Sequence, residues 1–165
     1  MRLKPLHAVL AVAMLAGEAG AQAQTGWAGV AIPERARQNY MLKCQGCHRA
    51  DASGDARTSP AMAGTVARFL GVDGGRDYLA RVPGVATAVL DDAALAELLN
   101  WTLYRFDRAH LPADFKPYTA AEIGRARTRP LRTEAAATRA ALMTKIEAGE
   151  VRSSNPKKTT QVGPS

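Results

Sequence analysis

Apolar residues recur every three to four positions between residues 92 and 106, which is the period of one face of an α-helix. The stripe consists of Leu95, Leu98, Leu99, Thr102, Leu103 and Phe106. Asp91 or Asp92 can cap its first turn, since a carboxylate accepts hydrogen bonds from free backbone N–H groups. The pattern predicts the strongest helix of the chain, over residues 92–105. Apolar and polar residues alternate over no useful length anywhere in the sequence, so the predicted fold class is all-α.

Shorter helical patterns lie on both sides of this segment. Pro33 is a favourable first helical residue, and residues 33–42 predict a helix that leads into the first cysteine. A short helix is also expected over residues 63–70. After the strongest helix, Thr119-Ala120-Ala121-Glu122 fits a capping box, and residues 133–148 predict a further helix that Gly149 ends. Loop-like compositions occupy residues 49–60, residues 71–76 and the Pro83-Gly84 turn.

The N-terminus has the composition of a secretory signal peptide. Arg2 and Lys4 precede an apolar run at residues 8–16, and small residues then provide a cleavage site after Ala23, with Ala21 as the alternative. The run is shorter than the roughly 20 residues that span a bilayer, and no later stretch approaches that length. We therefore expect residues 1–23 to be removed, residues 24–32 to form a linker, and the mature protein to be soluble and periplasmic.

The formal net charge is +7, and its excess lies after residue 106. Residues 107–165 hold eleven Lys and Arg against six Asp and Glu, whereas residues 24–106 are nearly balanced. We expect a helical domain at 33–106, a basic helical extension at 107–149 and a disordered tail at 150–165. Nucleic acid is not expected as a partner of an exported protein. The basic extension fits an acidic redox partner, anionic lipid or an ordinary solvated face.

The motif with the clearest chemistry is Cys44-Gln45-Gly46-Cys47-His48, because Cys-x-x-Cys-His is the signature of covalent c-type haem attachment. Two cysteines one helical turn apart can each bond a vinyl-derived carbon of one porphyrin, and the histidine can then ligate the iron. A structural zinc site needs four ligands, but the chain has two cysteines and, besides His48, only His110 and His7, and His7 lies in the predicted signal peptide that is removed. A thioredoxin-like site would need a strand-rich βαβ pattern around the motif. One covalent haem c is therefore expected.

Around this motif, residues 33–106 resemble the class I, mitochondrial-type family of monohaem cytochromes c. Ala36 and Tyr40 match the small and aromatic residues that this family places before the first haem cysteine, and Leu98 and Trp101 suit the opposing positions on its last helix. Ser59-Pro60-Ala61-Met62 resembles the family's Pro-x-Leu element. The resemblance implies a cytochrome c-like helical haem domain in which the Pro60 carbonyl orients His48 through its Nδ1–H group.

The chain departs from this family at the second axial ligand of the iron. The family's methionine, often followed by proline, is replaced by Val82-Pro83, and valine cannot ligate iron. No methionine lies between Met62 and Met143. Met62 and His110 are the candidate sixth ligands, and an open or water-occupied position is the third alternative.

Electron transfer is the function that these features indicate, since one covalent haem in a helical shell changes oxidation state without a substrate pocket. The expected partners are a periplasmic dehydrogenase and a downstream cytochrome or oxidase, with no enzymatic activity of the chain's own. One alternative is an open-site haem protein that binds a diatomic gas or reacts with peroxide, with His110 and Arg81 or Arg108 beside the iron. Another is a non-catalytic subunit that its extension docks onto a larger enzyme.

Overall fold

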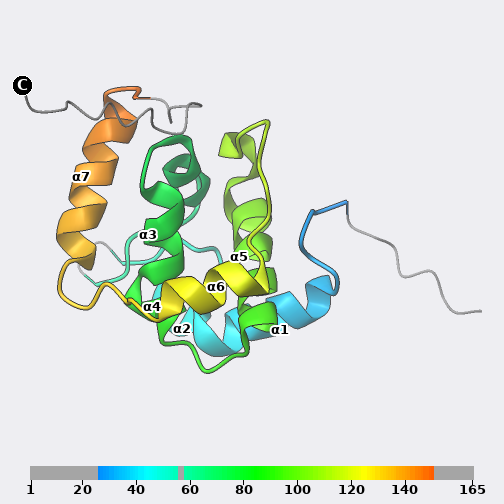
Figure 1. The fold of residues 1–165 in the computed structure, drawn as a ribbon. Coiled ribbons are helices and arrows are strands. Elements are labelled where there is room, and N and C mark those ends of the chain that lie inside the picture. The colour runs from blue at the N-terminus through cyan, green and yellow to red at the C-terminus, as the bar shows by residue number, and fades with distance from the viewer. Residues whose placement is uncertain (1–25, 56–57, 151–165) are drawn as a thin grey trace, which may run out of the picture.

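The computed structural model describes residues 26–55 and 58–150, and within these ranges every regular element is helical (Figure 1). The elements are α1 (Pro33–Lys43), α2 (Gln45–His48), η1 (Val66–Gly71), α3 (Gly75–Arg81), α4 (Pro83–Ala86), α5 (Asp92–Asp107), η2 (Arg108–His110), α6 (Ala120–Arg127) and α7 (Ala135–Glu147). Strand-like pairing in this part of the chain is limited to an isolated bridge between Asp55 and Ser59. The predicted all-α fold class is confirmed.

Helix α5 forms the centre of the fold, and α1 and α6 pack against it. The Asp91 carboxylate accepts a hydrogen bond from Ala94 N at 2.7 Å, so Asp91 rather than Asp92 is the N-cap. The predicted leucine stripe is buried in the core. The helix continues to Asp107, two residues beyond the predicted end. Asp107 is buried there, and the hydrogen bond that its Oδ2 atom accepts from Ala67 N at 2.8 Å offsets part of the cost of burying its carboxylate.

Helix α1 crosses α5 through the residues that the sequence suggested. Ala36 and Tyr40 are buried, and the Tyr40 ring lies 5.5 Å from the Trp101 ring and 4.9 Å from the Phe106 ring, centroid to centroid. The Tyr40 hydroxyl donates a hydrogen bond to the Arg49 carbonyl at 2.7 Å. Tyr40 thus connects the helix before the cysteines to α5 and to the loop after His48.

The start of α1 is held by a residue that its own sequence does not reveal. Ile32 provides no side-chain cap. The buried Glu97 of α5 instead accepts hydrogen bonds from the backbone N–H groups of Ala31 and Ile32 at 2.9 and 2.8 Å. An anionic carboxylate is favourable at a helix N-terminus, where the N–H groups lack partners within the helix. Glu97 therefore links the beginning of α1 directly to α5.

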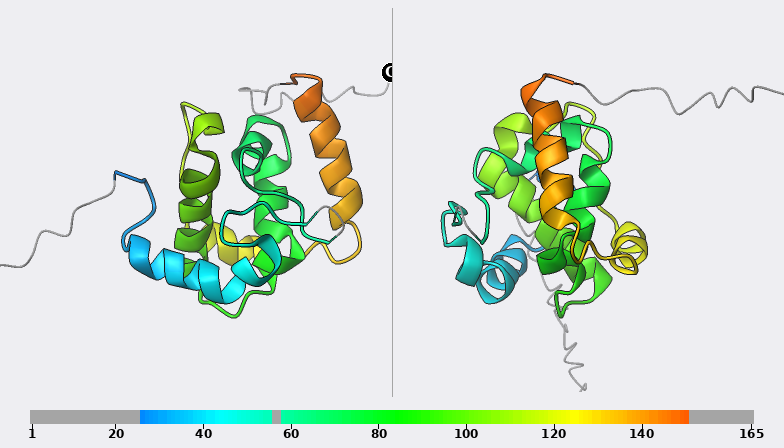
Figure 2. Two further views of the ribbon diagram at one scale, coloured as in Figure 1. Left: turned by 180° about the vertical axis from the view of Figure 1, so that it is seen from behind. Right: turned by 90° about the vertical axis from the view of Figure 1, so that its left-hand side faces the viewer.

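The C-terminal extension packs on the same core as the preceding residues. Tyr118 and Ile123 are buried beside α5 and α3. Helix α7, which carries the buried Leu142, packs against η1 and α3 (Figure 2). Thr119 accepts a hydrogen bond from Glu122 N at 3.2 Å, as the capping box predicts, but the Glu122 carboxylate pairs with Arg76 instead of completing the box. The positive φ of Gly149 ends α7 as expected.

Three sequence predictions need correction between η1 and α5. The short helix expected at 63–70 is a 3₁₀ helix that begins at Val66. The loop expected at 71–76 contains the start of α3. Pro83-Gly84, expected as a turn, begins the one-turn helix α4. Gly74 adopts a left-handed conformation, with φ of 88°. Gly75 then brings its backbone against the Phe69 carbonyl, which leaves no space for a Cβ atom. A left-handed backbone explains the glycine at position 74, and close backbone approach explains the glycine at position 75.

No helix within the described residues is long and apolar enough to cross a membrane. The predicted signal peptide at 1–23, the first two residues of the predicted linker and all of the predicted tail at 150–165 except Glu150 lie outside the described residues.

Candidate haem-attachment site

The two cysteines and His48 occupy the junction between α1 and α2. Cys44 follows the last residue of α1, and Cys47 and His48 form the last two residues of α2. The backbone N–H groups of Cys47 and His48 both donate to the Cys44 carbonyl, at 3.2 and 2.9 Å. This helical turn places both thiols and the imidazole on adjacent positions of one short segment.

Both thiols are free, but their environments differ. Cys44 is half-buried, packs against the hydrophobic core and has a thiol pKa raised to about 11. Burial is the main cause, because it disfavours the thiolate, and the neighbouring Cys47 adds to it. Cys47 is exposed. One sulfur therefore lies at the edge of the core and the other at the surface, an arrangement suited to a ligand that is partly enclosed.

The His48 imidazole has a buried nitrogen without a protein partner. Within the described residues, no group forms a well-aligned hydrogen bond with its Nδ1 atom. Burial lowers the pKa of His48, and the Pro60 carbonyl beside the ring opposes this effect in part. The neutral imidazole is the form that ligates iron. The Pro60 carbonyl is close enough to influence His48, as the family resemblance implies, although a well-formed hydrogen bond to Nδ1 is not present.

The loop after His48 returns the chain so that Pro60 comes beside the imidazole. Arg49 and Ala52 adopt positive φ angles of 63° and 58°, and Gly54 N donates to the His48 carbonyl at 3.1 Å. Gly54 also has a positive φ, and a Cβ atom there would collide with the Ser59 carbonyl. The backbone of this loop is therefore fixed by close contacts that depend on glycine.

The candidate sixth ligands lie in different surroundings. Met62 is half-buried at the edge of the core, and its backbone N–H donates to the Ala52 carbonyl at 2.9 Å, which ties it to the loop after His48. Val82 is half-buried between α3 and α4 and also packs against the core. The side chain at the family's methionine position is thus apolar and cannot ligate iron.

His110 is engaged in a separate polar cluster. Its Nδ1 atom lies 2.5 Å from Asp107 Oδ1, and its Nε2 atom lies 3.0 Å from Arg68 Nη2. A guanidinium only donates hydrogen bonds, so Nε2 is the acceptor and Nδ1 carries the proton that is donated to Asp107. Both ring nitrogens are occupied, which argues against His110 as an iron ligand.

A haem c group fits the residues at the α1–α2 junction. The two free thiols can form thioethers, and His48 offers an imidazole whose second nitrogen is buried beside a carbonyl. Within residues 26–55 and 58–150, no group of three or more His, Cys, Asp or Glu side chains gathers as a candidate metal site.

Comparison with known proteins places the chain in a family. A protein named cytochrome c-552 from Thermus thermophilus is 30% identical over 121 residues, which cover 62% of this chain and 82% of that relative. The chain belongs to the c-type cytochromes. A second cytochrome c-552 from Thermus thermophilus is 32% identical to this c-type cytochrome over 107 residues, covering 54% of the chain and 82% of the relative. No protein-family model and no solved structure matches it.

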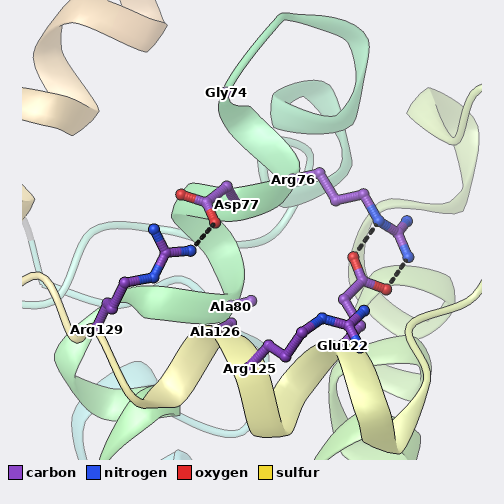
Figure 3. A pocket seen from close by; sticks show the side chains of 8 residues that line it. All are labelled: Gly74, Arg76, Asp77, Ala80, Glu122, Arg125, Ala126 and Arg129. Atoms are coloured by element: carbon purple, nitrogen blue, oxygen red, sulfur yellow. Dashed lines mark hydrogen bonds and ion pairs between the residues drawn. The ribbon is translucent and has the colours of Figure 1, made fainter.

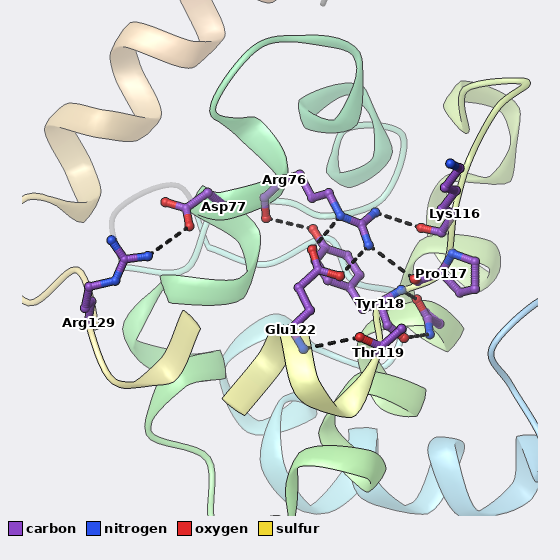
Figure 4. A network of polar contacts seen from close by, with 9 residues as sticks. Arg76, Asp77, Lys116, Pro117, Tyr118, Thr119, Glu122 and Arg129 are labelled. Carbon is purple, nitrogen blue, oxygen red and sulfur yellow. Dashed lines mark hydrogen bonds and ion pairs between the residues drawn. The ribbon is translucent and has the colours of Figure 1, made fainter. Parts of the chain in front are cut away.

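A second polar region of the cytochrome lies between α3 and α6 and was not predicted. A surface cavity of about 320 Å³ is lined there by Gly74, Arg76, Asp77, Ala80, Glu122, Arg125, Ala126 and Arg129 (Figure 3). Arg76 forms two hydrogen bonds with the Glu122 carboxylate, at 2.6 and 2.7 Å, and its guanidinium lies 4.1 Å from the centre of the Tyr118 ring (Figure 4). These contacts fasten α6 to α3.

Charged residues on packed faces are what the sequence analysis missed. Glu97 lies within the apolar pattern of α5, and Arg127 ends the short helix α6. A charged residue inside an apolar stripe is the sequence signal that could have indicated a buried ion pair, since charged side chains are seldom buried without a partner. That signal marks Glu97 but does not identify its partners, which lie more than 60 positions earlier in the chain.

Proposed function

We propose that this c-type cytochrome carries single electrons through one haem that is attached to Cys44 and Cys47 and ligated by His48. The observation that carries the proposal is the turn of α2, where two free thiols lie beside an imidazole with a buried, unpartnered Nδ1 atom. Held by these three residues, a haem would supply one-electron redox chemistry without any change in its bonds to the protein. The exposed Cys47 supports access of a redox partner to this edge.

The packing around the motif supports a redox role for the site. Tyr40, Trp101 and Phe106 form an aromatic cluster between α1, α5 and the loop after His48. Cys44 packs at the edge of the same hydrophobic core. An apolar surround would disfavour the more highly charged ferric state and so shift the reduction potential, and a rigid surround would limit structural rearrangement during electron transfer.

The cellular role that we propose follows from the N-terminal sequence and the charge distribution. The signal-peptide pattern at residues 1–23 supports export to the periplasm. Electrons would arrive from a periplasmic dehydrogenase and leave to a downstream cytochrome or oxidase, with the chain itself acting as a carrier and not as an enzyme. The basic residues after position 106 support approach of an acidic protein surface.

The attachment is tested by acid-acetone extraction and a pyridine haemochrome assay of the purified full-length protein. We expect one acid-stable haem per chain in the wild type, and none after combined Cys44→Ala and Cys47→Ala substitution. Gly46→Ala is the matched control, because its Cβ atom would meet nothing within 4 Å and both thiols remain. Acid-stable red colour in the double variant would show that the attachment assignment is wrong.

A second candidate function is supported by the surroundings of the candidate sixth ligands. Val82 cannot bind iron, and both nitrogens of His110 are engaged by Asp107 and Arg68. An iron with an open position could bind a diatomic gas. Reaction with peroxide is less well supported, because Arg81 is bound to Asp77 at 2.6 Å and to the Arg129 carbonyl at 2.6 Å.

Carbon monoxide distinguishes the two functions in the reduced protein. A low-spin spectrum that carbon monoxide does not change supports electron carriage with two protein ligands. A high-spin spectrum with rapid carbon monoxide binding supports the open-site function. The near-infrared band of thioether-ligated ferric iron further tests Met62 as the sixth ligand.

A further inference from the structure

One arginine of the C-terminal extension binds the end of α4, the residues that follow it and the start of α5 through four hydrogen bonds. The Arg127 guanidinium donates hydrogen bonds to the carbonyls of Ala86, Ala88 and Leu90, at 3.2, 2.6 and 2.9 Å, and to Asp92 Oδ1 at 2.9 Å. Its side chain is only 22% exposed. The planar, five-donor guanidinium is the side chain that can serve this many acceptors from one position.

Neighbouring residues of the extension bind the chain just before this segment. Leu131 N donates to the Arg81 carbonyl at 2.9 Å, and Arg81 Nε donates to the Arg129 carbonyl at 2.6 Å. Residues 127–131 therefore hold the chain on both sides of Val82 and α4. The contacts of Arg127 with the carbonyls of Ala86 and Ala88 join residues about 40 positions apart in sequence, so residues 82–90 depend on the extension for them.

The extension is itself firmly fixed, so it can act as a rigid support. Ile123 of α6 is fully buried. At the opposite end of α6, Arg76 pairs with Glu122 and also donates to the carbonyls of Lys116 and Pro117, at 2.7 and 3.2 Å (Figure 4). Arg127 thus extends from a helix whose own position is determined by burial and by charged hydrogen bonds.

The supported segment lies at the same end of the molecule as the cysteine motif. Helices α2 and α4 both lie toward the lower end of the ribbon (Figures 1 and 2). Val82 and Val85 are half-buried, and like Cys44 they pack at the edge of the core. Partly exposed apolar side chains on this segment are suited to contact an apolar ring attached to Cys44 and Cys47.

We propose that Arg127 is a positioning residue for the haem site: it fixes residues 82–90 at the end of the molecule that carries the cysteine motif, and would thereby limit access of external ligands to an iron held by His48. The inference rests on the proposed attachment of haem to α2. It assigns to the C-terminal extension a role within the redox site, in addition to its packing role. Loss of the four hydrogen bonds frees the segment to open without removing any residue that contacts the iron.

The test compares Arg127→Gln and Arg127→Lys with Arg125→Gln in the full-length, haem-loaded protein. Arg125 is an exposed arginine of the same helix, which makes its substitution a matched control for charge. Carbon monoxide binding to the reduced protein is followed after flash photolysis. The midpoint potential is measured, and hydrogen exchange is followed in peptides that cover residues 82–92. Arg127→Lys keeps the charge but not the planar fork, and it provides a milder variant if Arg127→Gln does not fold.

We expect both Arg127 variants to accelerate amide exchange in residues 82–92 by about tenfold or more, with faster carbon monoxide binding and a shifted midpoint potential. The Arg125 control should match the wild type in all three measurements. Unchanged carbon monoxide binding and potential in the Arg127 variants would overturn the inference, even if exchange increases. Failure of the proposed function would be recognised independently of these results, because the wild type would then contain no acid-stable haem.

Discussion

The Glu97 carboxylate of α5 accepts a hydrogen bond from Arg35 Nε of α1 at 2.8 Å, while its other oxygen accepts two backbone N–H groups at the start of α1. Glu97 is 5% exposed and Arg35 is 49% exposed. The two residues therefore differ in how much free energy each loses when the contact is broken. The buried carboxylate needs its partners, whereas the arginine can be hydrated when it leaves.

Glu97→Gln should destabilise the protein by about 1–3 kcal/mol, because a neutral amide replaces a carboxylate that serves three donors in a buried position. Arg35→Gln should cost less than about 1 kcal/mol, since the backbone N–H groups still satisfy Glu97 and the arginine is half exposed. Denaturant unfolding of both variants measures the difference. Equal losses would show that the ion pair, and not the helix cap, is the main contribution of Glu97.

Gly54 is predicted to be far less tolerant of substitution than Gly46, although both lie close to His48. Gly54 has a φ of 65°, and a Cβ atom there would collide with the Ser59 carbonyl, whereas nothing lies within 4 Å of one at Gly46. Gly54→Ala should cost about 2 kcal/mol or more, and Gly46→Ala less than about 0.5 kcal/mol.

Thermal unfolding of the two alanine variants provides the stability measurement, and the visible spectrum reports on the His48 environment. Gly54→Ala is also expected to alter that spectrum, because the 49–60 loop brings Pro60 beside the imidazole. A Gly54→Ala protein with wild-type stability and spectrum would contradict the proposed dependence on this turn.

The sequence predicted the features of this fold that depend on local pattern. The helix at 92–105 and the caps at Asp91 and Thr119 follow from apolar periodicity and short polar side chains, and the structure contains all three. The motif at residues 44–48 gave the candidate site directly, because its chemistry is contained in five adjacent residues.

Features that depend on distant contacts were not predictable in the same way. Helix α3 begins at Gly75, where the sequence pattern suggested a loop. Glycine is required there because the Phe69 backbone leaves no space for a Cβ atom. The partners of Arg127 are backbone carbonyls about 40 positions earlier, and a carbonyl has no sequence signature. The second axial ligand is a nonlocal feature of the same kind, since tertiary packing and not a local motif decides which side chain could reach an iron bound to His48.

Tyr118 should make the stability of the protein depend on pH in alkaline solution. Its hydroxyl donates to the Arg76 carbonyl at 2.8 Å, and burial raises its pKa far above the ordinary value of 10.0. Ionisation is therefore easier in the unfolded chain, so the contribution of Tyr118 is complete below pH 10 and is lost as pH rises above it. We expect the wild type to lose more stability than Tyr118→Phe between about pH 9 and about pH 11.

Denaturant midpoints at the two pH values test this dependence, and the double difference removes effects that the proteins share. Tyrosinate absorbance should also show that Tyr118 ionises only as the protein unfolds. Parallel losses of stability in the wild type and in Tyr118→Phe would mean that the buried hydroxyl does not control the alkaline transition.

His110→Ala is expected to leave the visible spectrum and the carbon monoxide response of the haem protein as in the wild type. The imidazole is held by Asp107 and Arg68 through both of its nitrogens, so its removal frees no position on the iron. The substitution should instead lower stability by about 1–3 kcal/mol, because Asp107 is 4% exposed and loses one of its hydrogen-bond donors. Absorption spectra of the oxidised and reduced variant, with denaturant unfolding, separate the two effects.

New carbon monoxide binding in His110→Ala would identify His110 as the sixth ligand. It would also require the Asp107–His110 contact to break when haem binds, so Asp107→Asn, which weakens that contact, should then leave iron ligation intact.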